Sequence, residues 1–275
     1  MSEWKTTTSS SETSQETSHN EGEYTYGALP SPFDSRDWVA ENVYKRRRNR
    51  VAVPNTLDLR KNLQEVRNQG SQGTCAAQTA ACMKEFQEKI DIGLSQHLSP
   101  QYIYNHRSNY PTDGMHGRDV MRILKEEGVC RETEFEYGSE ERPEEISVSV
   151  KTEARRHIIK SYARVESIEG LKESLLLNGP CYISFPCYNN AKKFWIQRPT
   201  DEKLLGGHAV TVVGYDKNGF ILRNSWDKGW GDDGYTTYPY EEWNMHWEIW
   251  TTVDDESPDI DYPESKKLCG KCIIS

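Results

Sequence analysis

A cysteine at the junction between a glycine-broken loop and a helix-forming run is the first residue that could do chemistry. Cys75 follows the loop Gln69–Thr74 and precedes an alanine-rich stretch. Unpaired backbone N–H groups and the positive end of the helix dipole lie at a helix N-terminus, and they lower the pKa of a thiol placed there. Much of Cys75 is therefore predicted to be thiolate near neutral pH. An ordinary buried cysteine, one of seven in the chain, is the alternative.

His208 and Asn224 are the partners that a nucleophilic thiol would need. His208 begins an apolar run typical of a β-strand, Asn224 follows in a second such run, and Lys217-Asn218-Gly219 between them is a hairpin turn. The two residues are therefore predicted on neighbouring antiparallel strands, within contact distance. A histidine can deprotonate a thiol, and an amide oxygen can hold the other imidazole nitrogen in one tautomer. Trp226 would shield that bond from water.

The elements that must position these residues fall into two halves of the chain. A helix beginning at Cys75 is predicted to be anchored by apolar positions at helical spacing, namely Thr79, Cys82, Met83, Phe86 and Ile90. The pattern of residues 53–153 predicts mostly helices, including 98–104 and 118–127. From residue 158 onward strands dominate, with a helix at 168–178. Helices first and strands later predict an α+β fold of two lobes, with the cleft between them bringing Cys75 to His208.

The chain resembles the papain-type cysteine peptidases, the cathepsin family, from about Val53 to Trp250. The residues that carry the resemblance are a glutamine six positions before the cysteine, a Gly-His-Ala strand and an Asn-Ser-Trp motif. They match Gln69, Cys75, His208 and Asn224. The resemblance implies endopeptidase or exopeptidase hydrolysis of a peptide or protein substrate through a thiolate–imidazolium pair and an acyl-enzyme intermediate. In that role the Gln69 side chain and the Cys75 backbone N–H stabilise the oxyanion.

The same resemblance implies a papain-like two-lobed fold, with a helical left lobe and an antiparallel β-barrel-like right lobe. It places substrate contacts at five positions, namely Gly73, Gly114, Met115, Gly207 and Trp226. Neither a metal nor a cofactor is expected. Two alternatives stay open: a catalytically silent papain-like binding module, and an acyltransferase or amidase that uses the same Cys-His pair.

Three departures from the secreted members of this family stand out. Gln72 and Thr112 occupy both positions of a disulfide found in those members, and this favours a reducing compartment. Met115 replaces the second glycine of a Gly-Gly pair and narrows the cleft wall. Ala76 replaces the usual aromatic residue after the nucleophile, which lessens packing around the thiol and favours altered or lost activity.

The chain is predicted to have four parts. Residues 1–22 form a disordered tail rich in Ser, Thr and Glu, and residues 23–52 form a leader that docks on the catalytic domain of 53–253. The aromatic, proline-bearing stretch 24–44 either inhibits by covering the cleft or is a strap on the back of a lobe. The basic run 45–50 is either a processing or nuclear signal or a solvated linker. Residues 254–275 form a flexible tail.

Composition and the two ends of the chain bear on location. A net charge of −9 over 275 residues argues against nucleic-acid binding. The chain has no apolar run long enough to span a bilayer and no apolar segment near residue 1, so we expect a cytoplasmic protein without a signal peptide.

The last four residues, Cys272-Ile273-Ile274-Ser275, fit a prenylation motif, and Cys269 could take a palmitoyl group. With nearby lysines these lipids would attach the protein to the cytosolic face of a membrane. A plain mobile tail and a Cys-x-x-Cys redox or metal pair are the alternatives.

Overall fold

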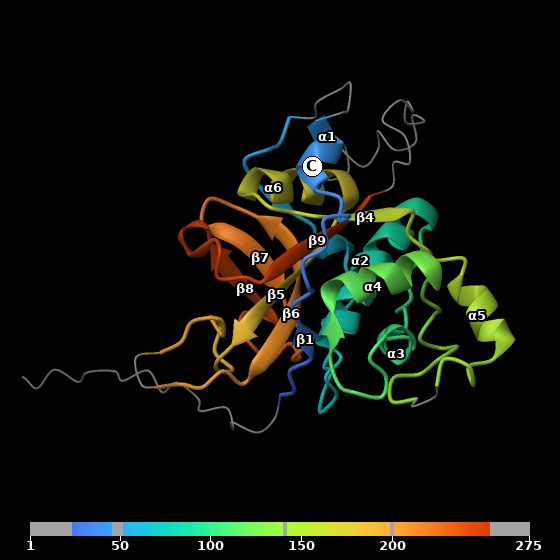
Figure 1. The fold of residues 1–275 in the computed structure, drawn as a ribbon. Helices are drawn as coiled ribbons and strands as arrows, with labels where there is room; N and C mark the ends of the chain where they lie inside the picture. Colours follow the sequence, from blue (N-terminus) through green and yellow to red (C-terminus); the bar gives the residue numbers. More distant parts are fainter. Residues whose placement is uncertain (1–23, 46–51, 140–141, 199–200, 254–275) are drawn as a thin grey trace, which may run out of the picture.

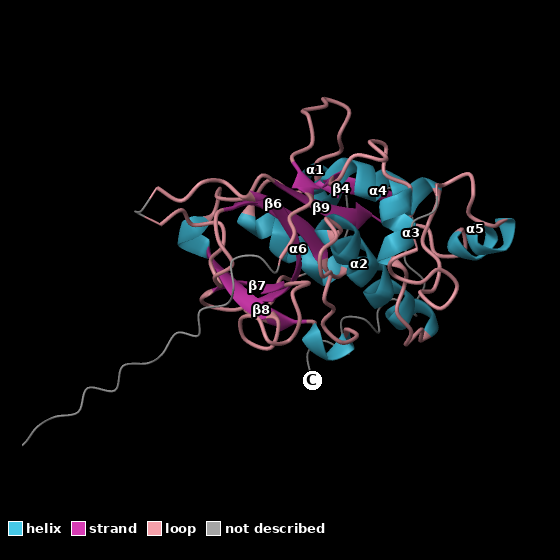
Figure 2. Cartoon of the chain, turned by 90° about the horizontal axis from the view of Figure 1, so that it is seen from below, coloured by secondary structure: helices cyan, strands magenta, loops and turns pink. Residues whose placement is uncertain are grey.

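The structure is a computed structural model that describes residues 24–45, 52–139, 142–198 and 201–253. It has two lobes side by side, one built mainly of helices and the other of a sheet (Figure 1). The view from below separates the same two groups (Figure 2). The predicted α+β class with two lobes is therefore confirmed.

The helical lobe is organised around α2, Cys75–Ile92, with α3 (Pro100–Asn105), α4 (Gly117–Glu126) and α5 (Val148–Ala154) around it. Helix α2 ends at Gly93, whose φ of 72° suits a residue without a side chain. The helix is buried on every side through Glu88, rather than along the single predicted stripe. The prediction was wrong at Ile90, which is exposed together with the rest of the last turn of α2, residues 90–92.

The sheet lobe is a seven-stranded antiparallel sheet in the order β4-β9-β5-β6-β7-β8, with β2 added beside β6. The strands are β2 (Leu57–Asp58), β4 (Ser161–Arg164), β5 (Cys181–Cys187), β6 (Gly206–Tyr215), β7 (Gly219–Arg223), β8 (Tyr235–Pro239) and β9 (Glu248–Val253). Helix α6, Ile168–Asn178, has the predicted bounds. Strand β4 begins three residues later than the predicted strand at 158.

The two lobes share a core at the place where α2 meets β6. Four alanines of α2 are fully buried, namely Ala76, Ala77, Ala80 and Ala81, and they belong to one apolar cluster with Ala209 and Trp250 of the sheet. Small side chains let the helix approach the strand closely, and a close-packed junction of this kind moves little. Cys75 at the start of α2 is therefore fixed against the first residues of β6.

Residues 24–45 add two elements that the sequence pattern did not single out. Strand β1, Ala28–Leu29, pairs in parallel with β3, Met115–His116. Helix α1, Ala40–Lys45, lies against α6. In Figure 1 this blue chain runs along the junction of the two lobes, from β1 to α1.

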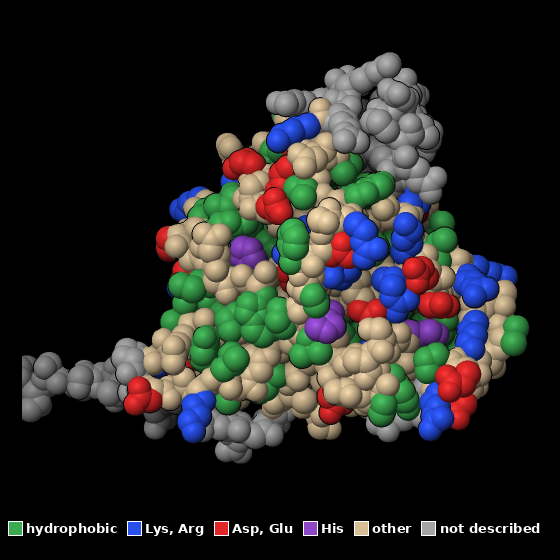
Figure 3. All heavy atoms as spheres, viewed as in Figure 1, with side chains coloured by type: hydrophobic (Ala, Val, Ile, Leu, Met, Phe, Trp, Pro, Cys, Tyr) green, Lys and Arg blue, Asp and Glu red, His purple; other side chains and the backbone are tan. Residues whose placement is uncertain are grey.

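The face that carries this chain divides by side-chain type (Figure 3). Charged side chains gather over α4, where Arg118 pairs with Asp37 and Arg122 pairs with Glu126. Hydrophobic side chains gather beside β5 and β6. No helix within the described ranges is both long and apolar enough to cross a bilayer. The predicted tails 1–22 and 254–275, the lipid sites Cys269 and Cys272, and the basic run after Lys45 lie outside the described residues.

Candidate active site

The candidate nucleophile is the first residue of α2. Cys75 has no exposed surface, and Thr74 precedes it without capping the helix through its side chain. The Thr74 hydroxyl is instead hydrogen-bonded to the Tyr137 hydroxyl at 2.7 Å. The N–H groups of the first turn of α2 are therefore left free of a capping side chain near the thiol.

His208 and Asn224 meet across β6 and the end of β7. Their closest polar atoms are His208 Nε2 and Asn224 Oδ1, 2.7 Å apart. The Trp226 ring stacks on the imidazole, with centroids 4.1 Å apart and planes 20° from parallel. His208 and Trp226 are both fully buried, so the bond to Asn224 lies away from water. The predicted arrangement of these three side chains is the one the structure has.

The Gln69 side chain extends from the loop before α2 to Ser225, the residue after Asn224. Its Oε1 accepts a hydrogen bond from the Ser225 hydroxyl at 2.7 Å. Its Nε2 donates to the carbonyl oxygens of Thr25 at 2.9 Å and Gln72 at 3.0 Å. A residue of the leader thus occupies the donor that was predicted to stabilise an oxyanion.

Residues 24–33, here called the cleft segment, lie against four of the five predicted substrate contacts through backbone atoms. The Met115 N–H donates to the Gly27 carbonyl at 2.7 Å, and an added Cβ on Gly207 would lie 2.1 Å from the Ala28 oxygen. A Cβ on Gly73 would lie 3.4 Å from the Gly27 Cα, and one on Gly114 would lie 3.1 Å from the Gly27 oxygen. The structure thus brings these positions together around the leader.

Two tyrosines of the cleft segment cover the fifth predicted contact, Trp226. The Tyr24 ring stacks on Trp226 at 4.6 Å between centroids, and the Tyr26 ring meets it edge-on at 6.1 Å. The Tyr26 hydroxyl donates to Asn190 Oδ1. Aromatic pairs of this kind contribute roughly 0.5–1.5 kcal/mol each beyond their buried area.

Glu248 is a buried carboxylate at the far end of the cleft segment, and no sequence motif marks it. Its Oε1 accepts hydrogen bonds from the Ser31 N–H at 3.3 Å, the Ser31 hydroxyl at 3.1 Å and the Gly117 N–H at 3.2 Å. The Trp250 indole donates to its Oε2. Glu248 therefore holds Ser31 against the start of α4, and only tertiary structure brings these residues together.

Burial shifts the pKa values of the cysteine and the histidine away from an ion pair. Desolvation raises the pKa of Cys75 to about 11, although the N–H groups of Ala209 and Gly27 oppose the rise. Desolvation lowers the pKa of His208 to about 4, and the bond to Asn224 opposes this only in part. The predicted low thiol pKa is therefore wrong for the cleft as the leader covers it, because lost solvation outweighs the helix dipole.

The raised pKa of Cys75 predicts how the reactivity of its thiol changes with pH. At pH 7, well below the pKa of about 11, roughly one Cys75 thiol in 10⁴ is ionised. Iodoacetamide labelling of Cys75 in the full chain should therefore be slow at pH 7 and become faster up to about pH 11. Deleting residues 1–33 should restore solvation and speed labelling at pH 7 at least about tenfold. Peptide mapping by mass spectrometry measures the labelling rate of Cys75. Equal rates in the full chain and in the shortened protein would contradict the prediction.

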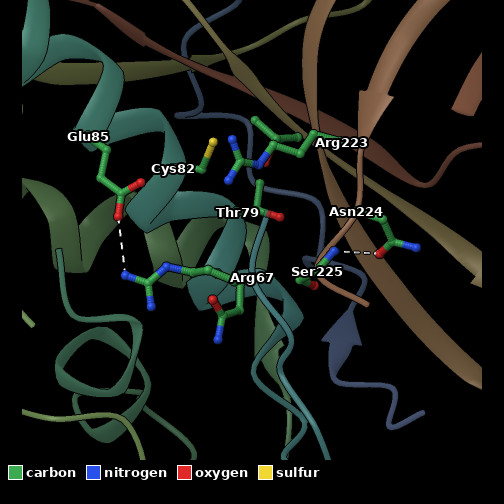
Figure 4. A pocket seen from close by; sticks show the side chains of 9 residues that line it. Arg67, Thr79, Cys82, Glu85, Arg223, Asn224 and Ser225 are labelled. Carbon is green, nitrogen blue, oxygen red and sulfur yellow. Dashed lines mark hydrogen bonds and ion pairs between the residues drawn. The ribbon is translucent and has the colours of Figure 1, made fainter. Parts of the chain in front are cut away.

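A small polar pocket lies behind Asn224, between α2 and β7 (Figure 4). Thr79 and Cys82 line it from α2, and Arg223 lines it from β7. Asn224 Oδ1 also accepts the Ser225 N–H at 2.8 Å, whereas Asn224 Nδ2 has no hydrogen-bond partner within the described ranges. The amide oxygen is thus fixed toward His208 by two N–H donors if His208 carries its proton on Nε2.

The family follows from a direct comparison. The family model described as papain family cysteine protease matches residues 53–251. The chain belongs to the papain family of cysteine proteases. The predicted family and its two-lobed fold are both confirmed.

Individual relatives of this papain-family chain agree with that assignment. Xylellain, a cysteine protease from Xylella fastidiosa, superposes with a TM-score of 0.69 at 29% identity, over 84% of this chain and 96% of that one. A cathepsin L-like proteinase of Phaedon cochleariae is 29% identical over 198 residues, which are 67% of this chain and 60% of that protein. Papain of Carica papaya is 26% identical over 200 residues, 54% of its length. The chain thus matches less than two thirds of either curated relative.

Proposed function

We propose that this chain is a cysteine peptidase that hydrolyses peptide bonds in peptide or protein substrates. The observation that carries the proposal is the His208–Asn224 bond of 2.7 Å, buried under Trp226 on the strand that packs against the start of α2. That arrangement leaves His208 Nδ1 without a hydrogen-bond partner among the described residues, available for a proton from a thiol.

The reaction would begin with transfer of the thiol proton of Cys75 to His208. The thiolate attacks the carbonyl carbon of the scissile bond, and the negative charge on the carbonyl oxygen is stabilised by Gln69 Nε2 and the Cys75 N–H. His208 then gives its proton to the leaving amine, which leaves a thioester on Cys75. A water molecule, deprotonated by His208, attacks the thioester and releases the carboxylate product. Asn224 keeps the imidazole in one orientation throughout.

Two assays separate this proposal from its alternatives. A thiol-reactive epoxide probe should label Cys75 in an enzyme but not in a silent binding module. Hydrolysis of a fluorogenic peptide library should then be detectable in a peptidase and absent from a dedicated acyltransferase or amidase. Both assays are best run on a variant lacking residues 1–33, since the leader covers the cleft. Labelling without any hydrolysis would contradict the peptidase.

We also propose that the cleft segment inhibits this activity. Three observations support it: the Thr25 carbonyl takes the Gln69 donor, the Gly27 carbonyl takes the Met115 N–H, and the two tyrosines cover Trp226. A substrate needs the same donors, so the two cannot bind together. The strap on the back of a lobe is the less supported alternative for these residues.

A single substitution should release the cleft segment. A Cβ on Gly27 would lie 1.8 Å from the Gly73 carbonyl oxygen, far inside van der Waals contact, and both partners are backbone. Gly27→Val should therefore expel the segment and raise peptide hydrolysis by the full chain at least about tenfold, with kcat/KM as the measurement. Gly229→Val is the matched control, because its Cβ meets nothing within 4 Å. Unchanged activity in Gly27→Val would argue against inhibition.

For location, we propose a cytosolic protein that attaches to a membrane through lipids on Cys272 and Cys269. The cysteines that the structure describes are all unpaired, which supports a reducing compartment. Intact-mass measurement of protein made in a eukaryotic cell with an active prenyltransferase tests the lipid. A mass equal to that of the unmodified chain would contradict it.

A further inference from the structure

We propose that the leader consists of two parts with different fates: a removable cleft segment, residues 24–33, and a permanent anchor, residues 37–45, joined by an exposed turn. Activation then requires a break in the turn around residues 33–36. A break in the basic run after Lys45, which the sequence suggested as a processing site, would leave the cleft covered. This inference rests on the proposed inhibition and adds where that inhibition is relieved.

The anchor is part of the hydrophobic core of the sheet lobe. Ala40 is fully buried and Tyr44 is 2% exposed, and both belong to the same apolar cluster as α6, β5 and β6. The Tyr44 hydroxyl is hydrogen-bonded to the Ser174 hydroxyl at 2.9 Å and accepts from Asn178 Nδ2 at 2.8 Å. Removing α1 would open a cavity and leave buried polar groups without their partners, which is costly.

Glu41 of the anchor also holds Ser167, the N-cap residue of helix α6, in place. Its Oε1 accepts hydrogen bonds from the Ser167 N–H at 2.9 Å, the Ser167 hydroxyl at 2.7 Å and the Glu166 N–H at 3.0 Å. A carboxylate at a helix N-terminus also interacts favourably with the helix dipole. The anchor therefore completes an element of the catalytic domain.

The anchor begins at Asp37. Its carboxylate pairs with Arg118 of α4 at 2.5 Å, and the Arg164 N–H of β4 donates to the Trp38 carbonyl at 2.7 Å. Val39 then forms an isolated bridge with Arg164. From Asp37 to Lys45 the chain is thus continuously attached to the body of the protein.

The cleft segment is attached in a different way. Most of its hydrogen bonds to the body use backbone atoms, and of its side chains only Ala28 is buried. Tyr24 and Tyr26 are partly exposed where they cover Trp226. Since Ala28 is its only buried side chain, such a segment can leave the cleft at a much smaller cost to the core than α1, once it is no longer tethered to the anchor.

The turn between the two parts, residues 33–36, is exposed, and its hydrogen bonds join residues within or next to the turn. The Phe33 residue is 88% exposed and the Arg36 side chain is also 88% exposed. Arg36 pairs with Asp34, and the Asp37 N–H donates to the Asp34 carbonyl. Exposed loop tips with polar residues and no bonds to the body of the protein are preferred sites of proteolytic cleavage. Hydrolysis by another peptidase adds one water across one peptide bond, giving a new carboxylate and a new amine on either side of the break.

The test uses two full-length variants that carry the same recognition sequence of a site-specific protease. One variant has it in place of residues 33–36, and the other has it in place of residues 46–51. Each protein is cut to completion and separated by size exclusion, and the retained fragments are identified by intact mass. Peptide hydrolysis and iodoacetamide labelling of Cys75 are measured before and after the cut.

The cut in the turn should release the cleft segment, keep α1 on the protein, and raise hydrolysis at least about tenfold, to the level of the deletion of residues 1–33. The cut at 46–51 should leave the whole leader bound and hydrolysis within about twofold of the uncut protein. Deletion through Lys45 should lower Tm more than deletion through Phe33, because only the former removes Ala40 and Tyr44 from the core of the sheet lobe.

Three results would overturn the inference. They are loss of α1 with full activation after the cut at 46–51, no release of the cleft segment after the cut in the turn, and equal Cys75 labelling after both cuts. A failure of the peptidase proposal would give a different result from these three. In that case hydrolysis stays absent after either cut, while the cut in the turn alone speeds labelling of Cys75, and the two-part leader stands.

Discussion

Replacing Cys75 with alanine, in a variant that lacks residues 1–33, will lower kcat/KM for peptide hydrolysis by about 10⁶-fold, to the background rate. Without the sulfur no thioester can form, and His208 has no thiol to deprotonate. The backbone N–H of residue 75 stays in place, since alanine suits the start of a helix. Steady-state kinetics with a fluorogenic peptide, calibrated against a no-enzyme blank, measure the effect.

The matched control is Cys130→Ala in the same background. Cys130 is also fully buried but lies in a separate cluster with Tyr102 and Phe135. The control should keep its kcat/KM within about twofold, because a cysteine-to-alanine change removes little volume and this site is remote from the cleft. Full activity in Cys75→Ala would show that another group attacks the substrate.

Replacing Gln69 with alanine in that background will lower kcat about 10²–10³-fold, with a small change in KM. The Nε2 group that now donates to the Thr25 carbonyl at 2.9 Å would donate to the oxyanion once the cleft segment has left. That hydrogen bond strengthens as charge develops on the oxygen. Its loss therefore destabilises the transition state more than the bound substrate, and kcat falls while KM changes little. Initial rates over a range of peptide concentrations separate kcat from KM.

A second variant guards against a structural explanation of the Gln69 result. Gln69→Glu keeps an oxygen that can accept the Ser225 hydroxyl but has no N–H to donate, so it should lose at least as much activity as alanine. Ser71→Ala, at an exposed position of the same loop, should be neutral. If the glutamate variant were as active as the parent, the side chain at 69 would not serve as the oxyanion donor.

The sequence was sufficient for the family and the general architecture. The spacing of Gln69, Cys75, His208 and Asn224 is a local property of three short motifs. The hairpin turn at 217–219 joins two adjacent antiparallel strands, and this brings His208 of β6 near Asn224, which follows β7, even though the pairing of these strands contains a register shift at Val212–Gly214. Element types also followed from local patterns, since helix α6 has its predicted bounds.

Tertiary structure alone decided what covers the site and what state the thiol is in. The Thr25 carbonyl, Glu248 and Tyr44 carry no motif, because their partners are far away in the chain and the contacts depend on two lobes closing on a short leader. The sequence correctly placed Cys75 at a helix N-terminus, where the dipole favours thiolate. It did not reveal the burial that raises the pKa of Cys75 to about 11, because desolvation depends on every atom that excludes water from the cleft.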